Sequence, residues 1–246
     1  MKKLMQLLRE NAQAARQPLQ LVRAEGDEAA TLYIYDVIDA YWGVSAEEVA
    51  QQISGLDAKT TLHLRINSPG GDVFEGRAIA TAISQHPGKT VAHIDGLAAS
   101  AATFISAAAD EVEISEGGFY MIHNGWTFAL GDKRVMTDTA ALLEKVDATI
   151  LAVYAKRTGA SAEQLVQWMD AETWFTAQEA VDNKFVDRIA TAPEKAQNAS
   201  RKTFNLAAFE RTPQALLEPP KQENPVDTAA WRAHNERRLR LLDLNA

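Results

Sequence analysis

Between residues 30 and 190 the apolar positions alternate between the period of a β-strand and that of an α-helix. Leu32, Ile34 and Val37 fall in a run rich in β-formers, whereas "SAEEVAQQISGL" opens with the capping box of Ser45 and Glu48. This alternation predicts strands at 30–39, 60–71, 89–96, 111–115 and 118–124, and helices at 45–56, 72–88 and 97–110. Strands that alternate with helices indicate βαβ units around a mostly parallel sheet.

Two more helices are expected after the sheet. A long helix at 137–158 has Thr137 or Asp138 as its cap and ends at Gly159, and a shorter helix follows Ser161. "TWFTAQEAVDNKFVDRI" then predicts a turn, a helix and a last strand. The amphipathic start and the Pro-, Gln- and Asn-rich end lie outside this pattern. We therefore divide the chain into a helical arm at 1–28, a catalytic domain at 29–191, and a polar linker with a helical tail at 192–246.

Composition narrows the class of protein. The 246 residues are 46% hydrophobic and carry a formal net charge of −8, which argues against a nucleic-acid-binding surface. No apolar run is long enough to span a membrane, and Gln6 and Arg9 interrupt the one that a secretory signal would need. The absence of cysteine excludes disulfides, thiolate metal sites and a cysteine nucleophile. We expect a cytoplasmic protein with no membrane partner.

One serine stands out because of its neighbours. "GLAASAA" at 96–102 surrounds Ser100 with residues too small to fill a core. A serine there caps a closely packed helix, or it is held open as a nucleophile. The second reading requires a base within reach, a group that orients the base, and hydrogen-bond donors for an oxyanion.

Two other motifs supply what a nucleophilic serine needs. Of the five histidines, His123 ends a strand, "FYMIH", and precedes "NGW", so its ring can project from the end of the sheet. "NSPGG" at 67–71 ends another strand in a glycine pair, which lets backbone N–H groups approach a ligand. Each motif alone also has a structural reading, as a core histidine or as a plain turn. Their order along the chain is more specific than either motif.

The blocks "RINSPGG", "GLAASAA", "YMIHN", "YAKRTG" and "TWFTAQEAVDNKFVD" come in one order over about residues 30–190. In this order they resemble the proteolytic subunit of the Clp protease, and most narrowly the Clp-related head maturation proteases of tailed phages and prophages. The resemblance implies an α/β fold of the crotonase and Clp-protease type, a ββα superhelix with a protruding handle helix. It also implies a ring-like homo-oligomer whose subunits enclose an inner chamber.

The resemblance assigns a role to each candidate site residue. Ser100 matches the nucleophile, His123 the general base, and the N–H groups of Gly70, Gly71 and Ala101 the oxyanion hole. The family's acidic member is an aspartate just before the block that reads "WFTAQEA" here. That position holds Glu172, and Asp170 lies two residues earlier, so the third member is Glu172 by alignment or Asp170 by residue type. A Ser-His dyad without an acid also stays open.

The implied activity is a serine endopeptidase that processes phage capsid or scaffold proteins and needs no metal or cofactor. We expect it in the host cytoplasm or in the assembling prohead, and nothing in the sequence indicates docking of an ATPase. The alternatives are a crotonase-like acyl-CoA enzyme, a Ser-Lys dyad using Lys133 or Lys145, and an assembly protein whose site has decayed.

Apolar positions along the long helix suit burial against a partner or within the monomer: Leu142, Leu143, Val146, Ile150 and Val153.

Overall fold

The computed structural model describes residues 19–23, 26, 28–190, 204–206 and 209–217. The chain divides into one compact unit up to Thr212 and a second from Pro213 onward, in which the four-residue helix α8 (Gln214–Leu217) is described. All other elements below belong to the first unit. Among the described residues, no helix combines the length and the apolarity that a membrane span requires.

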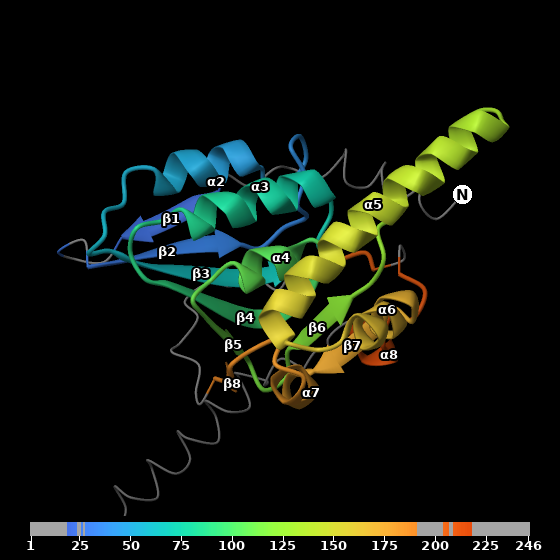
Figure 1. Cartoon of the computed structure of the whole chain (residues 1–246). Coiled ribbons are helices and arrows are strands. Elements are labelled where there is room, and N and C mark those ends of the chain that lie inside the picture. The colour runs from blue at the N-terminus through green and yellow to red at the C-terminus, as the bar shows by residue number, and fades with distance from the viewer. Residues whose placement is uncertain (1–18, 24–25, 27, 191–203, 207–208, 218–246) are drawn as a thin grey trace, which may run out of the picture. The chain divides into compact units, whose positions relative to one another are not determined.

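A single mixed sheet organises the first unit (Figure 1). Its main path runs β1-β2-β3-β4-β5-β8, and β6 branches from β4 and carries β7. All pairings are parallel except β1 with β2 and β6 with β7. The strands are β1 (Gln20–Arg23), β2 (Ala29–Ile34), β3 (Thr61–Ser68), β4 (Thr90–Ala99), β5 (Glu111–Ile114), β6 (Phe119–Ile122), β7 (Thr173–Thr176) and β8 (Arg188–Ile189).

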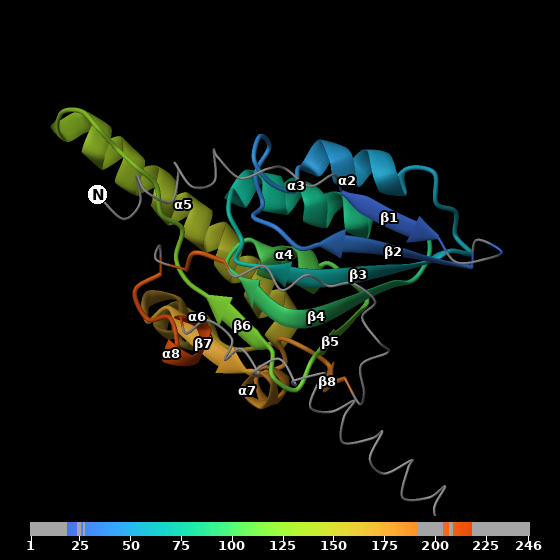
Figure 2. The same ribbon diagram turned by 180° about the vertical axis from the view of Figure 1, so that it is seen from behind.

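The helices begin where side chains satisfy their first N–H groups. Ser45, Asp72 and Asp132 accept hydrogen bonds from backbone N–H groups at the starts of α2, α3 and α5. The helices are α2 (Ala46–Ile53), α3 (Val73–Ser84), α4 (Ala102–Ala107), α5 (Lys133–Thr158), α6 (Ala162–Asp170) and α7 (Ala177–Asp182). α2, α3 and α4 lie side by side over one face of the sheet, and the C-terminal part of α5 packs beside α4 (Figures 1 and 2).

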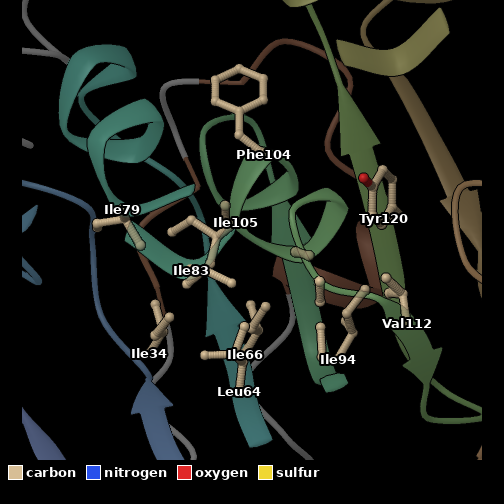
Figure 3. Close-up of a cluster of buried hydrophobic side chains, with 14 of the residues drawn as sticks. Ile34, Leu64, Ile66, Ile79, Ile83, Ile94, Phe104, Ile105, Val112 and Tyr120 are labelled. Atoms are coloured by element: carbon tan, nitrogen blue, oxygen red, sulfur yellow. The ribbon is translucent and has the colours of Figure 1, made fainter. Parts of the chain in front are cut away.

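The core lies between this helical layer and the sheet (Figure 3). Alternate residues of β2 and β3 are buried, as a sheet with one covered face requires. The central side chains are Ile34, Leu64, Ile66, Ile79, Ile83, Ile94, Phe104 and Ile105. The carboxyl ends of β3 and β4 are thereby fixed next to each other.

The opposite face of β2–β5 is lined by polar and aromatic side chains. Arg65 forms an ion pair with Asp95, which also accepts a hydrogen bond from the Tyr35 hydroxyl at 2.5 Å. Nδ1 of His63 lies 2.8 Å from Nε2 of His93. The alternation predicted for these strands therefore separates a buried apolar face from a polar one.

Within the predicted catalytic domain, the structure differs from the sequence-based elements at three places. β4 continues through Ala99, so Leu97, Ala98 and Ala99 end a strand, Ser100 lies in the turn that follows, and α4 begins only at Ala102. Asp132, not Thr137 or Asp138, caps the long helix, because its side chain accepts from the N–H groups of the first turn. Residues 173–176, expected as a turn, form β7, which pairs with β6.

The structure also differs from the prediction near the start of the chain. Gln20–Arg23, placed in the expected helical arm, form the edge strand β1. The rest of that arm up to residue 18 and the predicted terminal helix after residue 227 lie outside the described residues.

Candidate active site

Ser100 occupies the sharp bend between β4 and α4. Its φ of 53° lies in the left-handed region, which is unusual for a residue other than glycine. The bend is held by its own N–H, which donates to the carbonyl of Met121 at 2.9 Å. Thr103 Oγ1 donates to the Ser100 carbonyl at 2.5 Å from the other side. A strand–turn–helix bend of this kind exposes a side chain at the edge of a sheet and stores local strain.

His123 reaches Ser100 because β4 and β6 pair in parallel. Ala99 is opposite Met121, so the residues that follow the two strands emerge together at one edge. Nε2 of His123 lies 2.7 Å from Oγ of Ser100. The two side chains that the sequence resemblance pairs are therefore in hydrogen-bond contact.

The imidazole of His123 is partly buried. This burial lowers its pKa below the usual range, while the negative charge of Glu172 acts in the opposite direction. A histidine with a lowered pKa is neutral near pH 7 and can accept a proton there.

The glycine pair packs against the serine bend. β3 pairs with β4 through Ser68 and Ala98, which places the turn at 69–71 beside residues 99–101. A Cβ atom on Gly70, whose φ is +85°, would lie 2.5 Å from the Ala99 carbonyl oxygen and 2.8 Å from the Ala101 nitrogen. A Cβ on Gly71 would lie 2.1 Å from the Ile38 carbonyl oxygen. Only glycine fits at these two positions.

The N–H groups of this region are not equivalent. Gly70 donates to Ser68 Oγ at 3.2 Å, so its N–H already has a partner. Among the described residues, neither the N–H of Gly71 nor that of Ala101 donates a hydrogen bond. Of the three predicted donors, Gly71 and Ala101 are therefore available to a ligand.

The two candidate acids have different surroundings. β6 and β7 are antiparallel with Ile122 opposite Thr173, so continuing this register places Glu172 opposite His123. Asp170 ends α6, and its Oδ1 accepts a hydrogen bond from the Asn124 side chain at 2.7 Å. Of these two acids, Glu172 is the one whose negative charge raises the pKa of His123.

Neither acid is hydrogen-bonded to the histidine. Within the described part of the chain, no carboxylate accepts a hydrogen bond from Nδ1 of His123. The Glu172 carboxylate instead accepts from Trp174 Nε1 at 3.2 Å and from the backbone N–H groups of Glu210 and Arg211. Glu210 and Arg211 lie outside the sequence blocks described above, and no local motif marks them.

The structure does not support a Ser-Lys dyad at Ser100. Lys133 and Lys145 are exposed on α5, and neither is hydrogen-bonded to Ser100. No group of three or more His, Asp or Glu side chains with metal-binding geometry occurs among the described residues.

Apolar side chains are exposed on the loop before α5 and on the first half of this helix. They are Trp126, Phe128, Leu130, Val135, Met136 and Leu142, and we refer to them together as the exposed apolar handle. The second half of α5 is anchored by Ile150 and Tyr154, which are buried in the core. The five predicted apolar positions are thus divided: Leu142 is 52% exposed, while Ile150 is buried within the monomer.

Comparisons with known proteins agree with this architecture. The family model described as Clp protease matches residues 22–193. The ATP-dependent Clp protease proteolytic subunit 2 of Corynebacterium glutamicum is 32% identical over 157 residues, 58% of this chain and 72% of the relative. Subunit 1 of Streptomyces avermitilis is 31% identical over 169 residues, 66% of this chain and 78% of the relative.

A solved structure supports the same fold. A ClpP1 mutant from Listeria monocytogenes superposes with a TM-score of 0.58 at 27% identity, covering 65% of this chain and 90% of that chain. The α/β fold expected from the sequence resemblance is confirmed.

Proposed function

Because the chain belongs to the Clp protease family and is a serine-type peptidase, we propose that Ser100 is its nucleophile and His123 its general base. The observation that carries this assignment is the 2.7 Å contact between Oγ of Ser100 and Nε2 of His123. The strained bend at Ser100 and the lowered pKa of His123 suit the same roles.

The reaction follows from these positions. His123 removes the hydroxyl proton as Oγ of Ser100 attacks the carbonyl carbon of a peptide bond, and a tetrahedral intermediate forms. The protonated His123 then donates this proton to the departing amine, leaving an acyl-enzyme on Ser100. A water molecule, deprotonated by His123, hydrolyses the acyl-enzyme and restores the serine.

The N–H groups of Gly71 and Ala101 form the oxyanion hole in this proposal. Both lack an intramolecular acceptor among the described residues, whereas the N–H of Gly70 binds Ser68. One such donor contributes about 3 kcal/mol of transition-state stabilisation. Gly70 serves instead as the residue that allows the turn to approach the serine bend closely.

Glu172 is the acid that we assign to the triad. This assignment rests on the β6–β7 register, which places Glu172 opposite His123, and on the effect of the Glu172 charge on the pKa of His123. Asp170 holds Asn124 and the loop that follows His123. Glutamate for aspartate adds one methylene, and Glu172 has a left-handed φ of 47°.

The substrates that we propose are proteins, and specifically capsid or scaffold proteins processed during phage head maturation. This narrower role is supported by the sequence resemblance alone. The relatives described above are bacterial Clp subunits and support only the peptidase activity. We also propose a ring-like homo-oligomer assembled through the exposed apolar handle on α5 and its preceding loop.

Cleavage of a protein substrate tests this function. The chain is co-expressed with a capsid or scaffold protein, and both are followed by mass spectrometry. Cleavage by the parent chain and none by the Ser100→Ala variant supports the proposal. Equal cleavage by both chains contradicts the nucleophile assignment, and intact substrate with both chains supports an assembly protein with a decayed site.

A further inference from the structure

A segment from beyond the catalytic domain lies against the candidate triad. Residues 204–206 and 209–212 belong to the same compact unit as Ser100 and His123. Leu206 is 5% exposed, so the segment is anchored in the protein interior. The Thr212 hydroxyl donates to the Leu206 carbonyl at 3.3 Å and closes the segment into a loop.

This segment holds the carboxylate of Glu172. The N–H of Glu210 donates to Oε2 at 2.9 Å, and the N–H of Arg211 donates to Oε1 at 2.7 Å. Hydrogen bonds from N–H groups to a carboxylate are charge-assisted and stronger than neutral ones. Both oxygens are therefore bound by the segment in a position where no hydrogen bond to His123 forms.

The same segment covers the imidazole. The ring of Phe209 meets that of His123 edge to face, with centroids 5.5 Å apart and an interplanar angle of 86°. It meets the indole of Trp174 in the same way at 5.6 Å and 83°. Phe209 thus contributes apolar surroundings to a histidine whose pKa burial already lowers.

We propose that Leu206 and residues 209–212 form an autoinhibitory clasp that keeps Glu172 from pairing with His123, and that displacement of the clasp completes the triad. This inference rests on the proposed function. In the clasped state no carboxylate among the described residues accepts a hydrogen bond from Nδ1 of His123, so none of them fixes its tautomer or stabilises its protonated form. In the released state Glu172, freed of two backbone donors, accepts a hydrogen bond from Nδ1 of His123.

Proline substitutions test the clasp in the full-length chain. Glu210→Pro and Arg211→Pro each remove one N–H donor to Glu172, because proline has none. Glu210→Ala and Arg211→Ala are matched controls, since both side chains are exposed and the N–H is retained. Phe209→Ala removes the ring from His123 independently of the hydrogen bonds.

Two readouts separate release from a general loss of structure. The kcat/KM for a peptide substrate and the rate of Ser100 labelling by a fluorophosphonate are expected to rise about tenfold in the proline variants, as loss of a hydrogen bond to a charged group shifts a two-state equilibrium. Both are also expected to rise in Phe209→Ala, because the clasp loses its ring contacts with His123 and Trp174. The acid limb of the pH profile moves to higher pH, because the paired Glu172 raises the pKa of His123. The alanine controls retain the parent values.

The remaining outcomes distinguish failure of the clasp from failure of the proposed function. Labelling of Ser100 at the same rate in all variants overturns the clasp and leaves the nucleophile assignment intact. A fall in kcat/KM in folded Phe209→Ala also overturns it, because the segment would then support the site. Absence of Ser100 labelling in every folded variant rejects the proposed function, and the clasp with it.

Discussion

Ser100 illustrates how the backbone decides the reactivity of one residue. Read from its neighbours, it suits a small-residue helix start. In the structure it has a φ of 53° at the end of β4, where a hydrogen bond to Met121 and the approach of Gly70 hold the bend. A strained conformation persists only where the surroundings enforce it. The serine is therefore held within reach of His123 before any substrate arrives.

The fit of Gly70 against this bend gives a prediction at the residue scale. Gly70→Ala is expected to lower the free energy of unfolding by on the order of 1–3 kcal/mol, because the new Cβ collides with backbone atoms and φ is +85°. Urea denaturation measures the change. Gly117→Ala is the control, since its Cβ has nothing within 4 Å. Equal stability of the two variants would refute the packing argument.

The electrostatics of His123 predict the pH dependence of cleavage. Because burial lowers its pKa, the imidazole stays neutral, and kcat/KM is retained, as the pH falls below the usual value of about 6.5. Glu172→Gln removes the charge that raises this pKa, so the acid limb moves to still lower pH. The kcat falls on the order of tenfold or more, because the protonated histidine loses its negative neighbour.

A pH profile of kcat/KM checks both effects. Asp170→Asn is the control and leaves the acid limb unchanged, because Asp170 binds Asn124 instead. If Asp170→Asn moves the limb and Glu172→Gln does not, the assignment of the triad acid is wrong.

At the scale of elements, strand register brings the candidate residues together. Ala99 opposite Met121 aligns Ser100 with His123, and Ile122 opposite Thr173 aligns His123 with Glu172. Each of the three follows or precedes a strand rather than lying within it. Residues from three distant blocks therefore meet at one edge of the sheet.

Some of this arrangement is predictable from sequence and some is not. Ser45 and Glu48 correctly indicate the start of α2, because helix capping depends on residues that are close in sequence. The helix predicted at 97–110 is wrong at its start: Leu97, Ala98 and Ala99 end β4, where consecutive residues are buried and the period-two signal of a strand disappears. The contact between Glu172 and residues 210–211 has no local signal, since it depends on tertiary packing.

The joint between α4 and α5 gives a prediction at this scale. The hydroxyls of Thr103 and Tyr154 lie 2.7 Å apart in the buried interior. Tyr154→Phe is expected to lower the free energy of unfolding by about 1–2 kcal/mol, because Thr103 loses a partner. Urea denaturation provides the comparison with Tyr33→Phe, whose hydroxyl has no hydrogen bond within the described part of the chain. Equal loss in both variants would refute the role of this bond.

At the scale of the whole molecule, the exposed apolar handle indicates self-association. Its aromatic and aliphatic side chains are exposed on a helix whose other half is anchored in the core. An exposed cluster of this kind marks an interaction site more often than isolated apolar residues do. We expect the handle to be covered in the assembled state.

Light scattering coupled to size-exclusion chromatography tests this expectation. Leu142→Asp, at a side chain that is 52% exposed, is expected to reduce the assembly to smaller species, because it buries a charge in the interface. Gln178→Asp adds the same charge on α7 and should leave the mass unchanged. An unchanged mass in Leu142→Asp would exclude this part of the handle from the interface.

The central claim is that Ser100 is a nucleophile activated by His123. Its most direct test is fluorophosphonate labelling of the purified chain, followed by peptide mapping of the modified residue. The account predicts a single adduct on Ser100 that is lost in Ser100→Ala and strongly slowed in His123→Ala, while both variants keep the circular dichroism spectrum of the parent. An unlabelled Ser100, or labelling at the same rate without His123, would contradict it.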